Sequence, residues 1–299
     1  MTPSLMLGLV GDGASGKSTL ARGIVRLLGH NGVTPLCLDD YHRYSRADRL
    51  ARALTDIDPA ANDLDLMADH LAALRTGEAI SKPVYDHHTG THRPPETVAA
   101  TGLILAYGML TLTPASLANL FDLTVYLEPD VVLRHAWRLA RDVRERGYTP
   151  DEVLALRDSR ERDATRFVRT QRPLADIVVR YHSSTTPSGF DIELLLRHDE
   201  EPTTTSNLIA EAAAQVGPAF SFTPAIRDDD ERQGDRLLIH STLAPDEATQ
   251  IAQALASDLP TLAASPLSSL GQINHNDPPT QSLPLALTQL IIVGRLLRG

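Results

Sequence analysis

The stretch Gly11-Asp12-Gly13-Ala14-Ser15-Gly16-Lys17-Ser18-Thr19 directly follows the apolar run Leu5–Val10. Its spacing is that of a phosphate-binding loop, in which a glycine, four further residues and Gly-Lys-Ser/Thr join a strand to a helix. Glycines let successive backbone N–H groups point inward at an anion, and the following helix adds its positive N-terminal end. The sequence therefore predicts a strand over 5–10, an amphipathic helix over 17–28 and a nucleotide bound between them.

Two side chains of the loop have particular roles in a site of this type. The Lys17 ammonium can reach the β- and γ-phosphates of a nucleotide, and the Ser18 hydroxyl can ligate Mg²⁺. A chance Gly/Ser turn is the alternative, but the complete pattern between a strand and a helix disfavours it. The predicted nucleotide-binding residues of the loop are Gly11, Asp12, Gly13, Ala14, Ser15, Gly16, Lys17, Ser18 and Thr19.

Length and composition narrow the class of protein. The 299 residues, 42% of them hydrophobic, suffice for one large domain or a domain with an extension. The formal net charge is −10 and falls mostly after residue 180, which argues against nucleic acid or an anionic membrane as the main partner. No apolar run approaches the ~20 residues of a membrane span. The single cysteine, Cys37, excludes an internal disulfide, so a cytoplasmic protein is expected.

A second predicted strand, Val33–Leu38, ends in Asp39-Asp40-Tyr41-His42. A strand–loop–helix–strand order implies a parallel sheet, in which ligands lie beyond the carboxyl ends of the strands. Asp39 and His42 are therefore expected at the same edge as the phosphate loop. A carboxylate there can accept the proton of a substrate hydroxyl or hold Mg²⁺ through water. An ordinary Asp turn or helix cap is the alternative for Asp39.

The segment Lys82–Glu96 is polar, rich in turn residues and without a helical period, which predicts a loop. His87, His88 and His92 could suggest a metal, but no cysteine accompanies them and their spacing is not that of a helical pair. Hydrogen bonds from this loop to a substrate phosphate or sugar are the favoured interpretation. Before it, Asp58–Met67 caps a helix whose Met and Leu residues are expected in the core.

A central strand over 101–108 ends in Ala106 and Tyr107, where phosphate-loop enzymes usually carry an acidic residue that assists Mg²⁺. Another strand, Leu123–Leu127, precedes a helix running to Gly147, and a second Arg-rich helix follows. These helices form either an Arg/Asp face in solvent or a mobile lid that clamps phosphates. Their arginines include Arg134, Arg138, Arg141, Arg144, Arg146, Arg157, Arg160, Arg162, Arg166 and Arg169.

After residue 182 the composition changes, with Ser/Thr/Pro-rich and acidic stretches at 183–189, 200–206 and 228–231. These predict linkers or loops around a few strands and helices. The expected elements after the strand Ala175–Tyr181 are strands at Ile192–Leu196 and Arg236–Ser241 and helices at Asp246–Ala256 and Leu285–Leu297.

Together, these segments resemble the phosphoribulokinase family, in the phosphoribulokinase/uridine kinase group of P-loop kinases, and most of all its plant and cyanobacterial form. The resemblance runs almost continuously from residue 5 to about 180. It rests on the phosphate loop, Cys37–His42, Asp58–Met67, Lys82–Gly90, Pro94–Glu96, Ala136-Trp137, Arg141-Asp142 and Arg146-Gly147.

The resemblance implies an α/β, three-layer P-loop kinase fold with a mainly parallel central sheet. It implies a core over 1–182 with an Arg-rich lid at about 134–172, and a divergent α+β extension over 183–299 packed on that core. The family uses ATP and Mg²⁺, works in the Calvin cycle and includes dimers and tetramers, so a homo-oligomer is possible.

The family transfers the γ-phosphate of ATP to the O1 hydroxyl of D-ribulose 5-phosphate. By resemblance Asp39 is the catalytic base, assisted by Lys17, and Ser18 binds Mg²⁺. Arg141 and Arg146 close on the nucleotide from the lid. The sugar-phosphate pocket is formed by His42, Arg46, Tyr85, His87 and Arg160.

Three positions depart from the family pattern. Tyr107 replaces the strand-end Glu, and Glu161 replaces a lid Lys. Ser15 replaces the loop Cys that, in photosynthetic members of the family, pairs with the equivalent of Cys37. Regulation by a disulfide between those two positions is therefore excluded here. Two other functions therefore stay open: a uridine-type nucleoside kinase, and a nucleotide-binding regulator with weakened catalysis. The segments 62–65 and 85–90 favour ribulose phosphate over a nucleoside.

Overall fold

The computed structural model describes residues 4–184, 189–199, 201–263, 265–273 and 280–299. The chain forms two compact units. Unit 1 comprises Met1–Lys17, Asn31–Tyr126 and Arg134–Ala175, and unit 2 comprises Ser18–His30, Leu127–Leu133 and Asp176–Gly299. The predicted division of the chain at residue 182, and the packing of an extension on a core, stay predictions.

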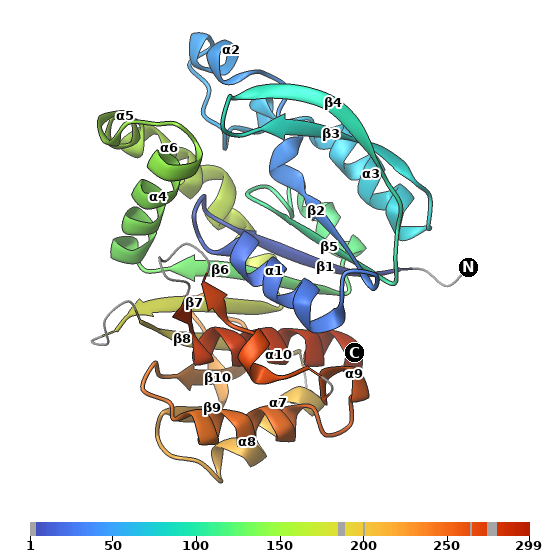
Figure 1. Ribbon diagram of the computed structural model, residues 1–299, viewed down its shortest axis with the longest axis vertical. Helices are drawn as coiled ribbons and strands as arrows, with labels where there is room; N and C mark the ends of the chain where they lie inside the picture. The colour runs from blue at the N-terminus through green and yellow to red at the C-terminus, as the bar shows by residue number, and fades with distance from the viewer. Residues whose placement is uncertain (1–3, 185–188, 200, 264, 274–279) are drawn as a thin grey trace. The chain divides into compact units, whose positions relative to one another are not determined.

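Unit 1 is built on strands in the order β2-β5-β1-β6 (Figure 1). Strand β6 begins in this unit and ends in unit 2. β5 pairs in parallel with β1 on one side and β2 on the other. The strands read as unbroken apolar runs because parallel strands are covered on both faces. The predicted mainly parallel α/β architecture and its strands are confirmed. Their bounds are β1 Leu5–Gly11, β2 Val33–Cys37, β5 Leu103–Gly108 and β6 Leu123–Pro129.

The core of unit 1 includes helix α3, Leu64–Arg75, whose first turn is capped by the Asp63 carboxylate. Met67, Leu71 and Leu74 are buried in one cluster with apolar residues of β1, β2 and β5. The prediction that the Met and Leu side chains of this helix form core is confirmed for these three, whereas Leu66 is exposed.

The segment predicted as a loop at Lys82–Glu96 is a β-hairpin, so that prediction is wrong. β3, Ile80–Asp86, pairs antiparallel with β4, Thr91–Val98. The Asp86 carboxylate accepts hydrogen bonds from the backbone of His88 and Thr89 and so closes the turn. Gly90 completes the turn with a φ of 75°, a conformation that glycine adopts without strain.

Short helices follow one another in the segment predicted as an Arg-rich lid (Figure 1). One helix to Gly147 and a second helix were expected, and the structure divides the second into shorter pieces that end in a π-turn and a 3₁₀ turn. The helices are α4 Val131–Glu145, α5 Pro150–Ala155 and α6 Arg157–Asp163; the short α2 lies at Arg46–Ala51.

Unit 2 continues from the end of β6 into strands of order β7-β8-β10-β9, which pair antiparallel from β7 onward. Strand β9 and helix α7 were not predicted, and the expected linkers at 183–189 and 200–206 lie partly outside the described residues. The strands are β7 Ile177–Ser183, β8 Phe190–Arg197, β9 Phe220–Arg227 and β10 Gln233–Ile239, with a small pair β11 Gln272–Ile273 and β12 Thr280–Gln281.

Two helices of unit 2 pack closely on each other. α1 follows the phosphate loop, and a Cβ added at its Gly23 would collide with the side chain of Gln289 in α10. None of the helices in the described ranges is long and apolar enough to cross a membrane. The helices are α1 Lys17–Leu28, α7 Thr204–Ala213, α8 Pro245–Leu255, α9 Pro260–Ala263 and α10 Leu283–Arg298.

Candidate active site at the phosphate loop

The loop after β1 has the backbone curl that its sequence predicts. Gly11 and Gly16 have φ of 156° and 92°, and Ala14, at 67°, holds the left-handed conformation without being glycine. The buried Lys17 Nζ donates hydrogen bonds to the carbonyls of Gly11 and Asp12, at 2.7 and 2.9 Å. The ammonium therefore lies over the loop that is predicted to cradle phosphate.

We expect nucleotide capture to weaken above about pH 8. Burial of the ammonium, assisted by the charge of Arg141 and opposed by Asp39, lowers the pKa of Lys17 to about 8. Only the protonated form attracts phosphate, so log kcat/KM for ATP should fall as pH rises through about 8. Steady-state kinetics from pH 6.5 to 10 measure this. Lys17→Arg keeps its charge throughout and should flatten the profile; a wild-type profile flat to pH 10 would contradict the assignment.

Asp39 lies in the turn that directly follows β2, at the carboxyl edge of the sheet. Its Oδ1 accepts a hydrogen bond of 2.8 Å from the backbone N–H of Met109, which follows β5. A Cβ at Gly108 would lie 3.1 Å from the same oxygen, so the strand end approaches Asp39 closely. Tyr107 precedes this glycine and pairs in register with Cys37 of β2 and Leu9 of β1. The structure thus brings Asp39 and Tyr107 to the edge where the sequence placed them.

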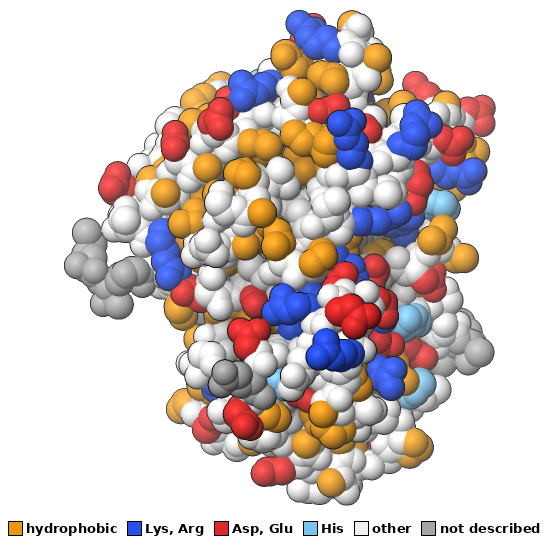
Figure 2. Space-filling view, turned by 180° about the vertical axis from the view of Figure 1, so that it is seen from behind, with side chains coloured by type: hydrophobic (Ala, Val, Ile, Leu, Met, Phe, Trp, Pro, Cys, Tyr) orange, Lys and Arg blue, Asp and Glu red, His pale blue; other side chains and the backbone are white. Residues whose placement is uncertain are grey.

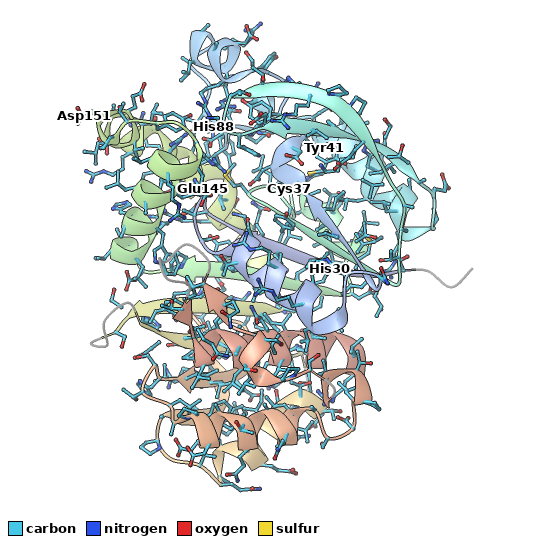
Figure 3. The ribbon with its side chains drawn as sticks, in the orientation of Figure 1. His30, Cys37, Tyr41, His88, Glu145 and Asp151 are labelled. Atoms are coloured by element: carbon cyan, nitrogen blue, oxygen red, sulfur yellow. The ribbon has the colours of Figure 1, made fainter. Side chains whose placement is uncertain are left out.

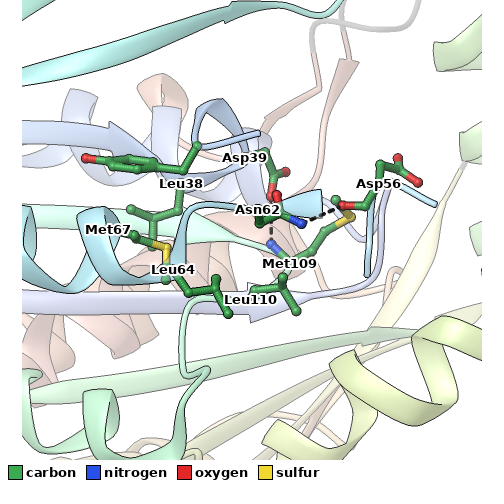
Figure 4. Close-up of a pocket in the computed structure, with 9 residues that line it drawn as sticks. Leu38, Asp39, Asp56, Asn62, Leu64, Met67, Met109 and Leu110 are labelled. Carbon is green, nitrogen blue, oxygen red and sulfur yellow. Dashed lines mark hydrogen bonds between the residues drawn. The ribbon is translucent and has the colours of Figure 1, made fainter. Parts of the chain in front are cut away.

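The loop that contacts Asp39 is itself held in place by Gln171, which sequence reasoning missed. The buried Gln171 amide donates to the carbonyl of Met109 and accepts from the N–H of Leu112, both at 2.8 Å. Figure 4 shows the pocket beside this loop, where Asp39, Asn62 and Asp56 lie with apolar side chains such as Leu64 and Met109.

His42 and Tyr85 meet in a buried cluster. The Nδ1 of His42 lies 2.7 Å from Oδ1 of Asn62, and the ring of Tyr85 contacts His42 edge-on with centroids 4.7 Å apart. Burial, with the nearby charge of Arg49, lowers the pKa of His42 to about 4, so the ring is neutral at pH 7. The His87 ring lies 5.1 Å from that of Tyr85. Three of the predicted substrate-binding side chains are therefore together.

Arg46 joins three elements of unit 1. Its Nη2 donates to the carbonyl of His87 at 2.6 Å and its Nη1 to the carbonyl of Arg146 at 3.3 Å. Its guanidinium also stacks 4.4 Å from the ring centroid of Tyr148. Arg46 thus links α2, the hairpin turn and the segment after α4. It thereby lies beside His87, and its predicted role in binding a sugar phosphate stays a prediction.

Arg49 is a candidate that sequence reasoning missed. Its side chain is buried, and its Nη1 has no hydrogen-bond partner within the described part of the chain. It is near enough to lower the pKa values of Asp56 and His42. Burial raises the pKa of Tyr85, and Arg49 opposes that rise. The available signal was its position on α2 three residues after Arg46, on the same face of the helix. A buried guanidinium with a free N–H is suited to an anionic ligand.

The predicted lid arginines converge on Asp142, which is wholly buried. Arg141 bonds to this carboxylate at 2.7 Å, and Arg146 and Arg160 lie 3.8 and 3.5 Å from it. Arg160 also pairs with Asp56 at 3.2 Å. Burial and the charge of Arg146 lower the pKa of Arg141 to about 10. A solvated Arg/Asp face therefore does not describe these side chains.

A second group of charges links the helices to the phosphate loop. The Asp12 carboxylate pairs with Arg134 and, at 3.3 Å, with Arg169. Glu161 pairs with the same two arginines, at 3.0 Å from Arg134. Arg138 adds a hydrogen bond of 3.0 Å to the carbonyl of Gly13. The Glu that departs from the family pattern thus serves as the counter-charge of two arginines.

The available donors fit Mg²⁺ carried by a nucleotide. Ser18 is exposed in the first turn of α1, and the Asp39 carboxylate is partly accessible. Both offer the hard oxygen ligands that Mg²⁺ prefers, and the ion usually completes its shell with water and substrate phosphates. On the face in Figure 2, acidic and basic side chains are interspersed.

The chain is similar in sequence to known kinases. A profile described as the Phosphoribulokinase / Uridine kinase family matches residues 6–186. A phosphoribulokinase of Synechocystis sp. is 36% identical over 176 residues, 59% of this chain and 53% of that protein. A chloroplastic phosphoribulokinase of Spinacia oleracea is 31% identical over 193 residues, 59% of this chain and 48% of that protein.

A uridine kinase of Brevibacillus brevis is 34% identical over 179 residues, 58% of this chain and 84% of that protein. The solved phosphoribulokinase from Rhodobacter spheroides matches with a TM-score of 0.61 at 14% identity, covering 88% of this chain and 99% of that one. That likeness shows a shared fold. The chain spans about half the length of the curated phosphoribulokinases that it matches.

Proposed function

The chain belongs to the phosphoribulokinase/uridine kinase family, and on that premise we propose that it phosphorylates D-ribulose 5-phosphate with ATP. The γ-phosphate is transferred to the O1 hydroxyl, giving ribulose 1,5-bisphosphate and ADP. This reaction would place the protein in the Calvin cycle. Its lone cysteine favours a reducing compartment such as the cytoplasm, without thiol–disulfide control.

Each predicted residue has a role in this proposal. The loop backbone and Lys17 bind the phosphates of ATP, and Ser18 holds Mg²⁺, which neutralises phosphate charge when bound. Asp39 accepts the proton of the O1 hydroxyl as the hydroxyl oxygen attacks. Phosphoryl transfer depends mainly on positioning and charge neutralisation. Arg141 and Arg146 would supply positive charge from the lid, and Arg160 would help hold the sugar phosphate.

The observation that carries the choice of substrate is the buried positive charge of Arg49 beside His42 and Tyr85. A sugar phosphate can accept a charge-assisted hydrogen bond from Nη1 of this guanidinium, which has no hydrogen-bond partner in the described part of the chain, whereas an uncharged nucleoside offers no charged acceptor. Arg46 and His87, which line the same cluster, carry further donors. This favours ribulose 5-phosphate over uridine.

Arg49→Met should raise KM for ribulose 5-phosphate by about 10- to 100-fold, since hydrogen bonds to charged groups contribute about 1.5–3 kcal/mol. KM for ATP should stay near the wild-type value. The matched control is Arg52→Met, which removes an exposed arginine from the end of the same helix and should change neither constant. A selective role in substrate binding would be rejected if both KM values rose together or neither changed.

Tyr107 supports the second candidate, a nucleotide-binding protein with weakened catalysis. If the absence of a carboxylate at position 107 limits turnover, Tyr107→Glu should raise kcat by about 10²-fold, the typical effect of one well-placed electrostatic contact. An ADP-release assay at saturating Mg²⁺ and ribulose 5-phosphate compares the variant with the wild type and with Tyr107→Gln. Equal rates for all three would show that the missing carboxylate does not limit turnover.

A further inference from the structure

The only cysteine of the chain lies beside an aspartate and a histidine. Cys37 ends β2, Asp40 follows it by three residues in the next turn, and His87 comes from the turn of the β3–β4 hairpin. The thiol sulfur, a carboxylate oxygen and a ring nitrogen all lie within 4.8 Å of one another. These three side chains are called the Cys37 cluster below.

The spacing suits a tetrahedral metal ion. With bonds of about 2.0 Å to nitrogen and oxygen and about 2.3 Å to sulfur, ligand atoms around zinc lie about 3.3–3.7 Å apart. Asp40 Oδ1 and His87 Nε2 are already 3.6 Å apart. The thiol sulfur lies within 4.8 Å of both of these atoms, so closing the three ligands on one ion needs an approach of at most about 1.5 Å.

The surrounding charges leave one oxygen of Asp40 for such an ion. Lys82 bonds to Oδ2, while Oδ1 faces His87. Lys82 is shared with Glu96, whose oxygen lies 3.2 Å away, so its positive charge is offset by two carboxylates. Burial, and after it the carboxylates of Asp40 and Asp39, raise the pKa of the Cys37 thiol. Of these causes, the two carboxylates place negative charge near the sulfur, and that charge attracts a cation.

We propose that the Cys37 cluster binds a divalent cation of the zinc class, with one coordination position left open. On binding, the thiol releases its proton to solvent and the sulfur lone pair bonds to the metal. The ion takes Nε2 of His87 and Oδ1 of Asp40. The site is distinct from that of Mg²⁺, which prefers oxygen ligands and avoids thiolate.

A metal ion bound to the Cys37 cluster would also inhibit the kinase, and this half of the inference rests on the proposed function. His87 is one of the side chains proposed to hold ribulose 5-phosphate, and its ring already contacts Tyr85 and His42. A metal on its Nε2 removes that nitrogen from the substrate. Zinc should therefore inhibit the kinase in competition with ribulose 5-phosphate.

Cobalt(II) tests the site without any need for turnover. Its thiolate complex has a charge-transfer band, and because Cys37 is the only cysteine, that band reports on Cys37 alone. Titration of the wild type with Co²⁺ should give the band at one equivalent, with Zn²⁺ displacing it. Cys37→Ser should lose the band, and His87→Gln should bind at least 10-fold more weakly.

His88→Gln is the matched control, because His88 is exposed and its Nδ1 lies 3.2 Å from the carbonyl of Glu145, away from the cluster (Figure 3). It should bind Co²⁺ like the wild type. Absence of the band in folded wild-type protein, or equal binding by His87→Gln, would overturn the site.

The inhibition has its own test. Zn²⁺ should raise the apparent KM for ribulose 5-phosphate in the wild type and leave Cys37→Ser unaffected. Inhibition that persists in Cys37→Ser would refute the regulatory half. A Co²⁺ band in a protein that lacks kinase activity would overturn only the proposed function, and kinase activity without the band would overturn only the metal site.

Discussion

Asp39→Asn is expected to reduce kcat by about 10²–10⁴-fold, the usual contribution of a positioned general base, while KM for ATP changes little. The amide keeps the size of the side chain and can still accept the N–H of Met109, which Asp39 now bonds at 2.8 Å. It cannot take the proton of the O1 hydroxyl. Coupled ADP release at saturating ATP and ribulose 5-phosphate measures the loss.

The matched control for Asp39 is Asp69→Asn, which neutralises an exposed carboxylate of α3 and should retain wild-type kcat. Thermal unfolding of both variants separates a chemical loss from a folding defect. If Asp39→Asn turned over as fast as the wild type, Asp39 would not be the catalytic base.

Asp142→Asn is expected to lower the free energy of unfolding by about 3–5 kcal/mol, the usual cost of removing one partner from a buried ion pair. The carboxylate is 0% exposed and faces three arginines, at 2.7 Å for Arg141, 3.5 Å for Arg160 and 3.8 Å for Arg146. Without it, these charges repel one another in a poorly solvated place. Urea unfolding followed by circular dichroism measures the change.

Asp158→Asn gives the comparison for Asp142. Its side chain is 84% exposed and forms an ion pair with Arg157 at 3.7 Å, so its loss should cost less than about 1 kcal/mol. If Asp142→Asn unfolds within 1 kcal/mol of the wild type, the arginines do not depend on this counter-charge.

The parts of the fold that local sequence determines were predictable. The runs at 5–10 and 103–108 are apolar without interruption because parallel strands are buried on both faces. The phosphate loop has a fixed spacing, and Asp39 directly follows a strand. From those facts alone the loop, Asp39 and the end of β5 could be placed at one edge.

The hairpin was missed because its sequence hides the strand pattern. Pro83, Pro94 and Pro95 are unusual within strands and read as turn signals, and β4 is exposed along almost its whole length. β9 is largely exposed as well, and Pro224 interrupts the short alternation of apolar and polar residues at Phe220–Thr223. Neither segment buries enough apolar surface to give a recognisable strand pattern in the sequence.

Contacts between residues far apart in the chain could not be predicted from a single sequence. Nothing local shows that Cys37 meets His87 across fifty residues, or that Glu161 is the counter-charge of Arg134 and Arg169. Arg49 is one of many arginines in the sequence, and nothing local shows that its side chain is buried. Burial and pairing of charged side chains depend on the tertiary structure, which periodicity does not encode.

The central claim is the identity of the acceptor, and phosphorus NMR of the reaction products tests it most directly. Purified protein is incubated with Mg²⁺ and ATP and with either ribulose 5-phosphate or uridine. We predict one equivalent of ADP for each ribulose 1,5-bisphosphate formed and no uridine monophosphate. Uridine monophosphate without the bisphosphate, or tight ATP binding with no product from either acceptor, would contradict the proposed function.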